Sequence, residues 1–108
     1  MSEQPKTFAF DWPEEQVRTF CHRWKIDELS IFGSALRDDF SSDSDVDLLA
    51  RFAIGAEWSV FDHARMESEL GEIFGRKVDL VTRLAVEESP NRNRRAEILR
   101  TAQPVYAV

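Results

Sequence analysis

The sequence lacks the features that mark secreted, membrane-spanning and general nucleic-acid-binding proteins. Cys21 is the only cysteine, so the chain can form no internal disulfide. It shows no secretory signal and no run of about 18 apolar residues that could span a membrane. Basic residues are in the minority, since 14 Lys and Arg against 20 Asp and Glu give a formal net charge of −6. Because affinity for nucleic acid comes mainly from Lys and Arg on phosphates, we expect a cytoplasmic protein that binds neither membranes nor nucleic acid directly.

The sequence does contain enough apolar material for one folded domain. Hydrophobic residues make up 43% of the 108 residues, and aromatic residues make up 11%. A chain of roughly 100 residues is typical of a single domain. We therefore predict one domain over residues 1–108, with a flexible arm formed by the polar residues 1–6.

The spacing of apolar residues predicts helices and strands that alternate along the chain. Asp11 suits the N-cap of a first helix, and Pro13 suits its first turn. The apolar residues that follow have helical spacing: Val17, Phe20, Cys21 and Trp24. Further helices are predicted over residues 59–74, closed by Gly75, and 91–102, and a helical turn is predicted after Gly33-Ser34. Strands are predicted over residues 28–32, 45–52, 77–81 and, at a sheet edge, 105–108. This order indicates an α/β or α+β domain with a small mixed sheet flanked by helices.

Two aspartates begin the predicted strand over residues 45–52. Because side chains at i and i+2 of a strand share a face, with alpha carbons roughly 6.5 to 7 Å apart, Asp45 and Asp47 are expected to converge. Such a pair is tolerated when it is solvated or when a divalent cation such as Mg²⁺ lies between the carboxylates. An EF-hand calcium loop that starts at Asp43 is excluded, because Leu48 and Ile54 stand where that loop needs Gly and Glu. By itself, the pair is also typical of a solvated surface.

A third carboxylate, Asp79, interrupts the apolar strand over residues 77–81. One interpretation is a solvent-facing position of an edge strand. The other is a site for two metal ions about 3.5 to 4 Å apart, built from three carboxylates on two strands. In that site Asp79 would also take the proton of the nucleophile.

The dipeptide Gly33-Ser34 falls where a strand is predicted to meet a helix. Such a junction presents backbone N–H groups, and here a hydroxyl, to an anion such as phosphate. A Gly-Ser turn is also ordinary loop chemistry, so its place relative to the aspartates is the informative part.

The spacing of these elements resembles a known family. The pattern is similar to the signature of the minimal nucleotidyltransferase (MNT) family of the DNA polymerase beta superfamily. It consists of Gly33-Ser34, ten further residues, Asp45-Val46-Asp47, and a later Asp79 between Val78 and Leu80. The resemblance covers residues 29–81 and implies the nucleotidyltransferase fold.

What the resemblance implies for the site is specific. Gly33 and Ser34 would hold the β- and γ-phosphates of ATP, and Asp45 and Asp47 would bind two Mg²⁺. Asp79 would complete the metal site and promote attack on the α-phosphate. Arg37 resembles a basic residue that neutralises the triphosphate, whereas the acidic residues at 38 and 39 depart from the family pattern.

The resemblance also implies an activity and a partner. Relatives of this size transfer AMP from ATP to a hydroxyl, expected to be that of a tyrosine, on a HEPN-type toxin, so that this chain would be the antitoxin of a HEPN/MNT pair and part of a hetero-oligomer. Two alternatives stay open: a non-catalytic antitoxin that binds its partner, and a nucleotidyltransferase that modifies a small molecule. The arginines at 92, 94, 95 and 100 either contact the partner or nucleotide or form a solvated helix face, and His22 and His63 are interpreted as ordinary helix-surface residues.

Overall fold

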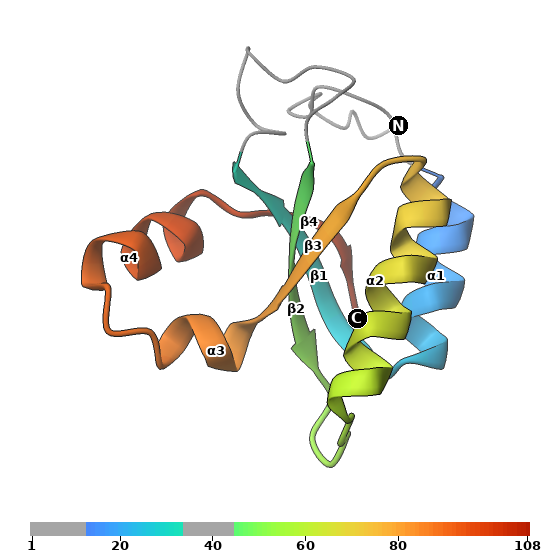
Figure 1. The fold of residues 1–108 in the computed structure, drawn as a ribbon, viewed down its shortest axis with the longest axis horizontal. Helices are drawn as coiled ribbons and strands as arrows, with labels where there is room; N and C mark the ends of the chain where they lie inside the picture. The colour runs from blue at the N-terminus through green and yellow to red at the C-terminus, as the bar shows by residue number, and fades with distance from the viewer. Residues whose placement is uncertain (1–12, 34–44) are drawn as a thin grey trace.

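The computed structural model describes residues 13–33 and 45–108 and shows a four-stranded mixed sheet with helices on both faces (Figure 1). The strand order is β3-β2-β1-β4. The strands are β1 (Ile26–Phe32), β2 (Val46–Phe52), β3 (Val78–Thr82) and β4 (Gln103–Ala107). The helices are α1 (Glu14–Arg23), α2 (Val60–Phe74), α3 (Arg83–Glu87) and α4 (Arg92–Thr101). The mixed α+β architecture expected from the sequence is confirmed.

Helix α2 is the crossover that makes β2 and β3 parallel, whereas β1 pairs antiparallel with both β2 and β4. The helix is fixed at both ends by local chemistry. Ser59 and Asp62 form a reciprocal capping box at its start, and the predicted cap Gly75 ends it in the left-handed conformation with φ of 69°. The crossover therefore returns the chain to the sheet beside β2.

Alternation along β2 separates two cores. Val46, Leu48 and Ala50 are buried on the face that α1 and α2 cover, where they meet Met66 and Leu70 of α2. On the opposite face a smaller cluster joins the sheet to α3 and α4, and its buried members are Phe32, Leu49, Val86 and Ile98. Figure 1 shows α1 and α2 side by side on one face and α3 and α4 beyond the other. The odd-numbered side chains of β2, Asp47 among them, thus lie on the face of α3 and α4.

The stripe predicted for the first helix is buried, with Val17, Phe20 and Cys21 on α1 and Trp24 just after it. Burial raises the pKa of the Cys21 thiol from 9.0 to about 12, so the group stays neutral at physiological pH. The N-cap position of α1 is Pro13, and the predicted cap Asp11 lies outside the described residues. Cys21 is therefore a packing residue.

Three elements differ from the sequence prediction. Strand β1 begins at Ile26, two residues earlier than predicted, because Ile26 pairs with Phe52 of β2 beyond an irregularity in the register. Helix α3 was not predicted, because five residues are too few for a helical period; its N-cap is Thr82, whose hydroxyl accepts the N–H of Ala85 at 3.1 Å. Strand β4 begins two residues earlier than predicted and includes Pro104, which an edge strand tolerates. Residues 1–6 and the helical turn expected after Ser34 lie outside the described residues. Within the described chain no helix is long and apolar enough to cross a membrane.

Candidate active site

Asp47 of β2 and Asp79 of β3 are register partners in the parallel pair of strands. Register partners point to the same face, and neighbouring strands lie about 4.8 Å apart. Asp47 is half-buried and Asp79 is exposed, while Asp45 is exposed immediately before β2. The backbone therefore brings two of the three predicted carboxylates side by side at the end of the sheet where β2 and β3 begin, with the third next to them.

Gly33, at the end of β1, lies next to Asp47 on the side away from β3. It follows β1 directly and has φ of 81°, a conformation that favours glycine. A Cβ atom at Gly33 would collide with Oδ2 of Asp47 and lie 3.3 Å from its Cγ. The Asp47 carboxylate thus occupies the space that any side chain at position 33 would need. Ser34 and Arg37, the other predicted phosphate ligands, lie outside the described residues.

The donor set suits Mg²⁺, although the carboxylates are not gathered into a cage. In the part of the chain that the structure describes, no three His, Cys, Asp or Glu side chains are arranged to hold one metal ion. Mg²⁺ is typically held by one or two carboxylates, waters and the phosphate oxygens of the substrate rather than by a closed protein cage. Asp47 and Asp79 on one open face meet that requirement, with Asp45 adjacent.

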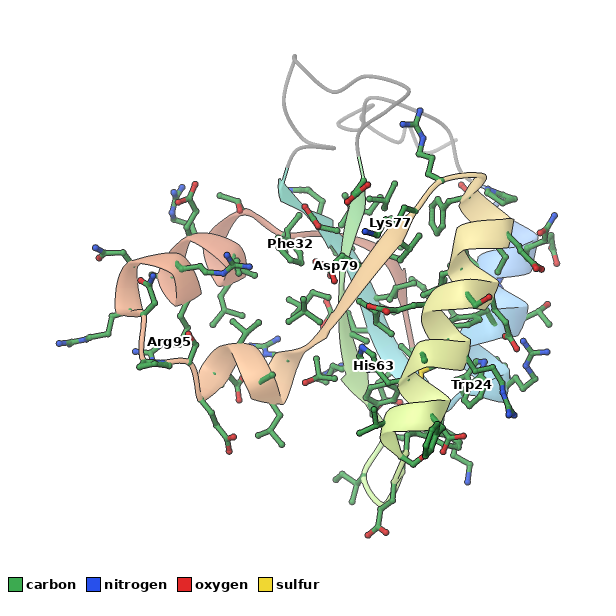
Figure 2. All side chains as sticks on the ribbon, in the orientation of Figure 1. Trp24, Phe32, His63, Lys77, Asp79 and Arg95 are labelled. Carbon is green, nitrogen blue, oxygen red and sulfur yellow. The ribbon has the colours of Figure 1, made fainter. Side chains whose placement is uncertain are left out.

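Lys77 is a basic residue at this site that the sequence interpretation left without a role. Its carbonyl accepts the N–H of Val46 at 2.9 Å, which anchors the start of β3 to the start of β2. Lys77 precedes Asp79 by two residues, so strand alternation directs both side chains to the same side of the sheet, and Figure 2 shows them at the same end. An exposed ammonium group therefore lies at the edge of the carboxylate pair.

The interpretation of His63 as an ordinary surface residue needs correction. His63 lies on the flank of α2 that faces the sheet, and its Nε2 is 2.9 Å from the carbonyl oxygen of Leu80 on β3. One turn further along, Oε2 of Glu67 accepts the N–H of Leu80 at 2.8 Å. The signal in the sequence was a His and a Glu at i and i+4 beside the buried Met66. His22 is exposed on α1, as expected.

The α4 arginines divide into two groups. Arg95 is half-buried and donates to the carbonyl of Ser89 at 3.0 Å and to that of Glu87 at 3.4 Å, so it ties α4 to the end of α3. The arginines at 92, 94 and 100 are exposed. Only this second group is available to a partner or nucleotide.

The chain matches a known protein family. The family model described as the nucleotidyltransferase domain matches residues 13–102. A candidate protein adenylyltransferase of Methanocaldococcus jannaschii is 39% identical over 57 residues, which are 53% of this chain and 59% of that protein. A second from the same organism is 28% identical over 64 residues, 59% of this chain and 64% of that protein. The chain thus spans less than two thirds of both relatives.

Solved structures give the same assignment. A candidate minimal nucleotidyltransferase is 34% identical, with a TM-score of 0.64 over 84% of this chain and 87% of that chain. A toxin–antitoxin complex with AMP-PNP contains a chain with a TM-score of 0.66 at 13% identity, over 88% of this chain and 73% of that chain. The toxin–antitoxin MntA–HepT gives 0.59 at 12% identity, over 88% and 70%. At these low identities the last two show the fold alone. The family model and the 34% identical structure together show that this chain belongs to the nucleotidyltransferase domain family, as a minimal nucleotidyltransferase.

Proposed function

We propose that the protein transfers AMP from ATP to a hydroxyl group of a partner protein, with tyrosine as the expected acceptor. The observation that carries this proposal is the register of Asp47 beside Asp79, with Gly33 against the Asp47 carboxylate. The two relatives from Methanocaldococcus jannaschii are named as candidate protein adenylyltransferases, which supports the choice of AMP and of a protein acceptor.

The reaction follows from what this site can hold. The acceptor oxygen attacks the α-phosphorus of ATP, an O–P bond forms, and the bond between the α-phosphorus and the bridging oxygen breaks to release pyrophosphate. An oxygen of the Asp79 carboxylate accepts the proton of the hydroxyl. When two Mg²⁺ ions are bound, they neutralise charge on the attacking and leaving oxygens. Asp45, Asp47 and Asp79 are the residues that would hold these ions.

The phosphates need donors as well as metal ions. We assign Gly33 and Ser34 to the β- and γ-phosphates, and Arg37 to the charge of the triphosphate. The position of Gly33 supports this assignment, because its left-handed backbone lies directly against the Asp47 carboxylate, so that a phosphate held there would be next to the proposed metal ligands. Lys77 adds a further positive charge at the same end of the sheet.

We infer that the partner is a HEPN-type toxin and that this chain acts as its antitoxin in a hetero-oligomer. The support is the fold shared with chains of toxin–antitoxin complexes, one of which was crystallised with the ATP analogue AMP-PNP. Modification of the toxin by AMP would neutralise it chemically. This outcome differs from simple coverage of the toxin surface by a bound antitoxin.

The experiment is to isolate the protein with whatever it binds in its own cells and to weigh the partner before and after incubation with ATP and Mg²⁺. The proposal predicts a mass increase of one or more AMP units on the partner, located at a hydroxyl side chain. A partner that is inhibited without ATP and carries no adduct supports the non-catalytic alternative. Adducts on a metabolite or antibiotic rather than on protein support the small-molecule alternative.

A further inference from the structure

In the part of the chain that the structure describes, side chains rather than another strand cover the outer edge of β3. The N–H of Val46 donates to the carbonyl of Lys77, so residues 77, 79 and 81 turn their main-chain groups toward β2. By alternation, the N–H and C=O of Leu80 point away from the sheet. Both groups find partners on α2, where Glu67 accepts the N–H at 2.8 Å and His63 Nε2 lies 2.9 Å from the carbonyl oxygen.

The contact with Glu67 acts on the peptide group between Asp79 and Leu80, and the contact with His63 acts on the next one along the strand. The N–H of Leu80 and the C=O of Asp79 belong to one peptide group, which is planar and therefore turns as a rigid body. On one side β2 pairs with this group, and on the other side Glu67 holds its N–H. Rotation of the group would swing the Asp79 side chain away from Asp47. The two sides together fix the direction in which Asp79 points.

The need for such support follows from the shape of β3. The strand has five residues and, within residues 13–33 and 45–108, pairs with β2 alone, so its ladder is short and lies at the sheet edge. Edge strands are the least constrained part of a sheet and carry unpaired main-chain groups. His63 and Glu67 compensate for the strand that is missing on this side.

The pair differs from an ordinary surface ion pair. His63 Nε2 and Glu67 Oε2 are 3.6 Å apart, and their side chains are only 34% and 32% exposed. Arg83 and Glu87 of α3 have the same i, i+4 spacing at 2.9 Å, but their side chains are 41% and 47% exposed. Each member of the His63 and Glu67 pair also contacts the backbone of β3, and Figure 2 shows His63 on α2 and Asp79 on the neighbouring strand.

We propose that His63 and Glu67 are positioning residues of the transfer reaction, which hold Leu80 so that the carboxylate of Asp79 keeps its place beside Asp47. This inference rests on the proposed AMP transfer. Neither residue is assigned a contact with ATP or the acceptor. Their loss is therefore expected to slow the chemical step rather than to weaken nucleotide binding.

The test compares three substitutions on α2. Glu67→Leu removes the acceptor for Leu80 N–H, Glu67→Gln keeps a carbonyl oxygen that can accept it, and Glu72→Leu changes an exposed glutamate of the same helix as a control. Two quantities are measured: the hydrogen-exchange rate of the Leu80 amide by NMR, and kcat and KM for ATP in AMP transfer to the co-isolated partner. The parallel change His63→Leu, with His63→Gln as its rescue, tests the carbonyl side.

For Glu67→Leu we expect hydrogen exchange of the Leu80 amide to be faster by about tenfold or more. We expect kcat to fall by about 10- to 100-fold, because small misplacements of a catalytic group lower rates by this order. KM for ATP should stay within about twofold of the wild-type value. Glu67→Gln and Glu72→Leu are expected to behave as the wild type. Wild-type kcat in Glu67→Leu overturns the inference, and so does a loss of kcat that Glu67→Gln fails to rescue. If the wild type transfers no AMP, the proposed function fails and the catalytic part of the inference fails with it. Exchange then decides only whether Glu67 holds the Leu80 amide: unchanged exchange in Glu67→Leu overturns this contact, and faster exchange with rescue by Gln supports it.

Discussion

Gly33→Ala tests whether Gly33 makes room for the Asp47 carboxylate of β2. The substitution has two separable effects. An alanine at φ of 81° costs about 1 to 2 kcal/mol of folding free energy, because Cβ crowds the backbone in the left-handed region. The new methyl group would also collide with Oδ2 of Asp47 and lie within 3.4 Å of its Cβ and Cγ, so the carboxylate must move by about 1 Å. Displacement of this size lowers the rate of a positioned reaction by about 100-fold.

Gly55→Ala is the matched control for this prediction. Gly55 has φ of 90°, so an alanine there meets the same backbone strain, but nothing lies within 4 Å of the added Cβ. Chemical denaturation should therefore show a similar loss of stability for both variants. In the AMP-transfer assay only Gly33→Ala should lose kcat. Equal kcat for Gly33→Ala and Gly55→Ala would refute the view that Gly33 makes room for a catalytic Asp47.

Three further predictions concern charge, the thiol and the core. Lys77→Met should raise KM for ATP by about three- to tenfold with a smaller effect on kcat, because one exposed charge near the triphosphate contributes roughly 1 kcal/mol; a Lys77→Arg variant with the same defect would argue against a charge effect. The pKa of Cys21 lies near 12 in the folded state and near 9.0 unfolded, so unfolding is favoured as pH rises from 9 toward 12. In this range the wild type should lose stability faster than Cys21→Ala, as followed by thermal unfolding, and parallel curves would contradict the burial of the thiol. Leu48→Ala, at a fully buried position of β2, should lower the free energy of unfolding by about 2 to 5 kcal/mol in urea titrations, and a loss below about 1 kcal/mol would place Leu48 outside the core.

The sequence was sufficient to predict the elements that have a clear period or a clear cap. The alternation of β2 placed Leu48 on one face and Asp47 on the other, and the structure confirms this separation. The left-handed Gly75 at the end of α2 is likewise a local feature, because the backbone conformation there depends on the absence of a side chain. Such features depend on neighbours within a few residues.

Contacts between distant parts of the chain could not be predicted in the same way. The register that pairs Asp47 with Asp79 depends on the length of the α2 crossover and on how α2 packs against the sheet, and no spacing in the sequence encodes it directly. The closeness of Gly33 to the Asp47 carboxylate is a property of the antiparallel register between β1 and β2. The contacts of His63 with Leu80 were missed for the same reason, since the backbone group that it meets belongs to another element. Sequence patterns predict which residues form the site, whereas the sheet determines their neighbours.

The central claim is that Asp45, Asp47 and Asp79 form one catalytic site for AMP transfer. The most direct measurement is AMP transfer from labelled ATP to the co-isolated partner by the wild type and by Asp47→Asn, with the amount of bound partner measured in the same samples. Asparagine keeps the size of the side chain and removes its charge, so the fold and the partner complex should persist. Loss of a group that stabilises the transition state electrostatically lowers the rate by about 100- to 1,000-fold, which is the result predicted here. Full transfer by Asp47→Asn would contradict the account.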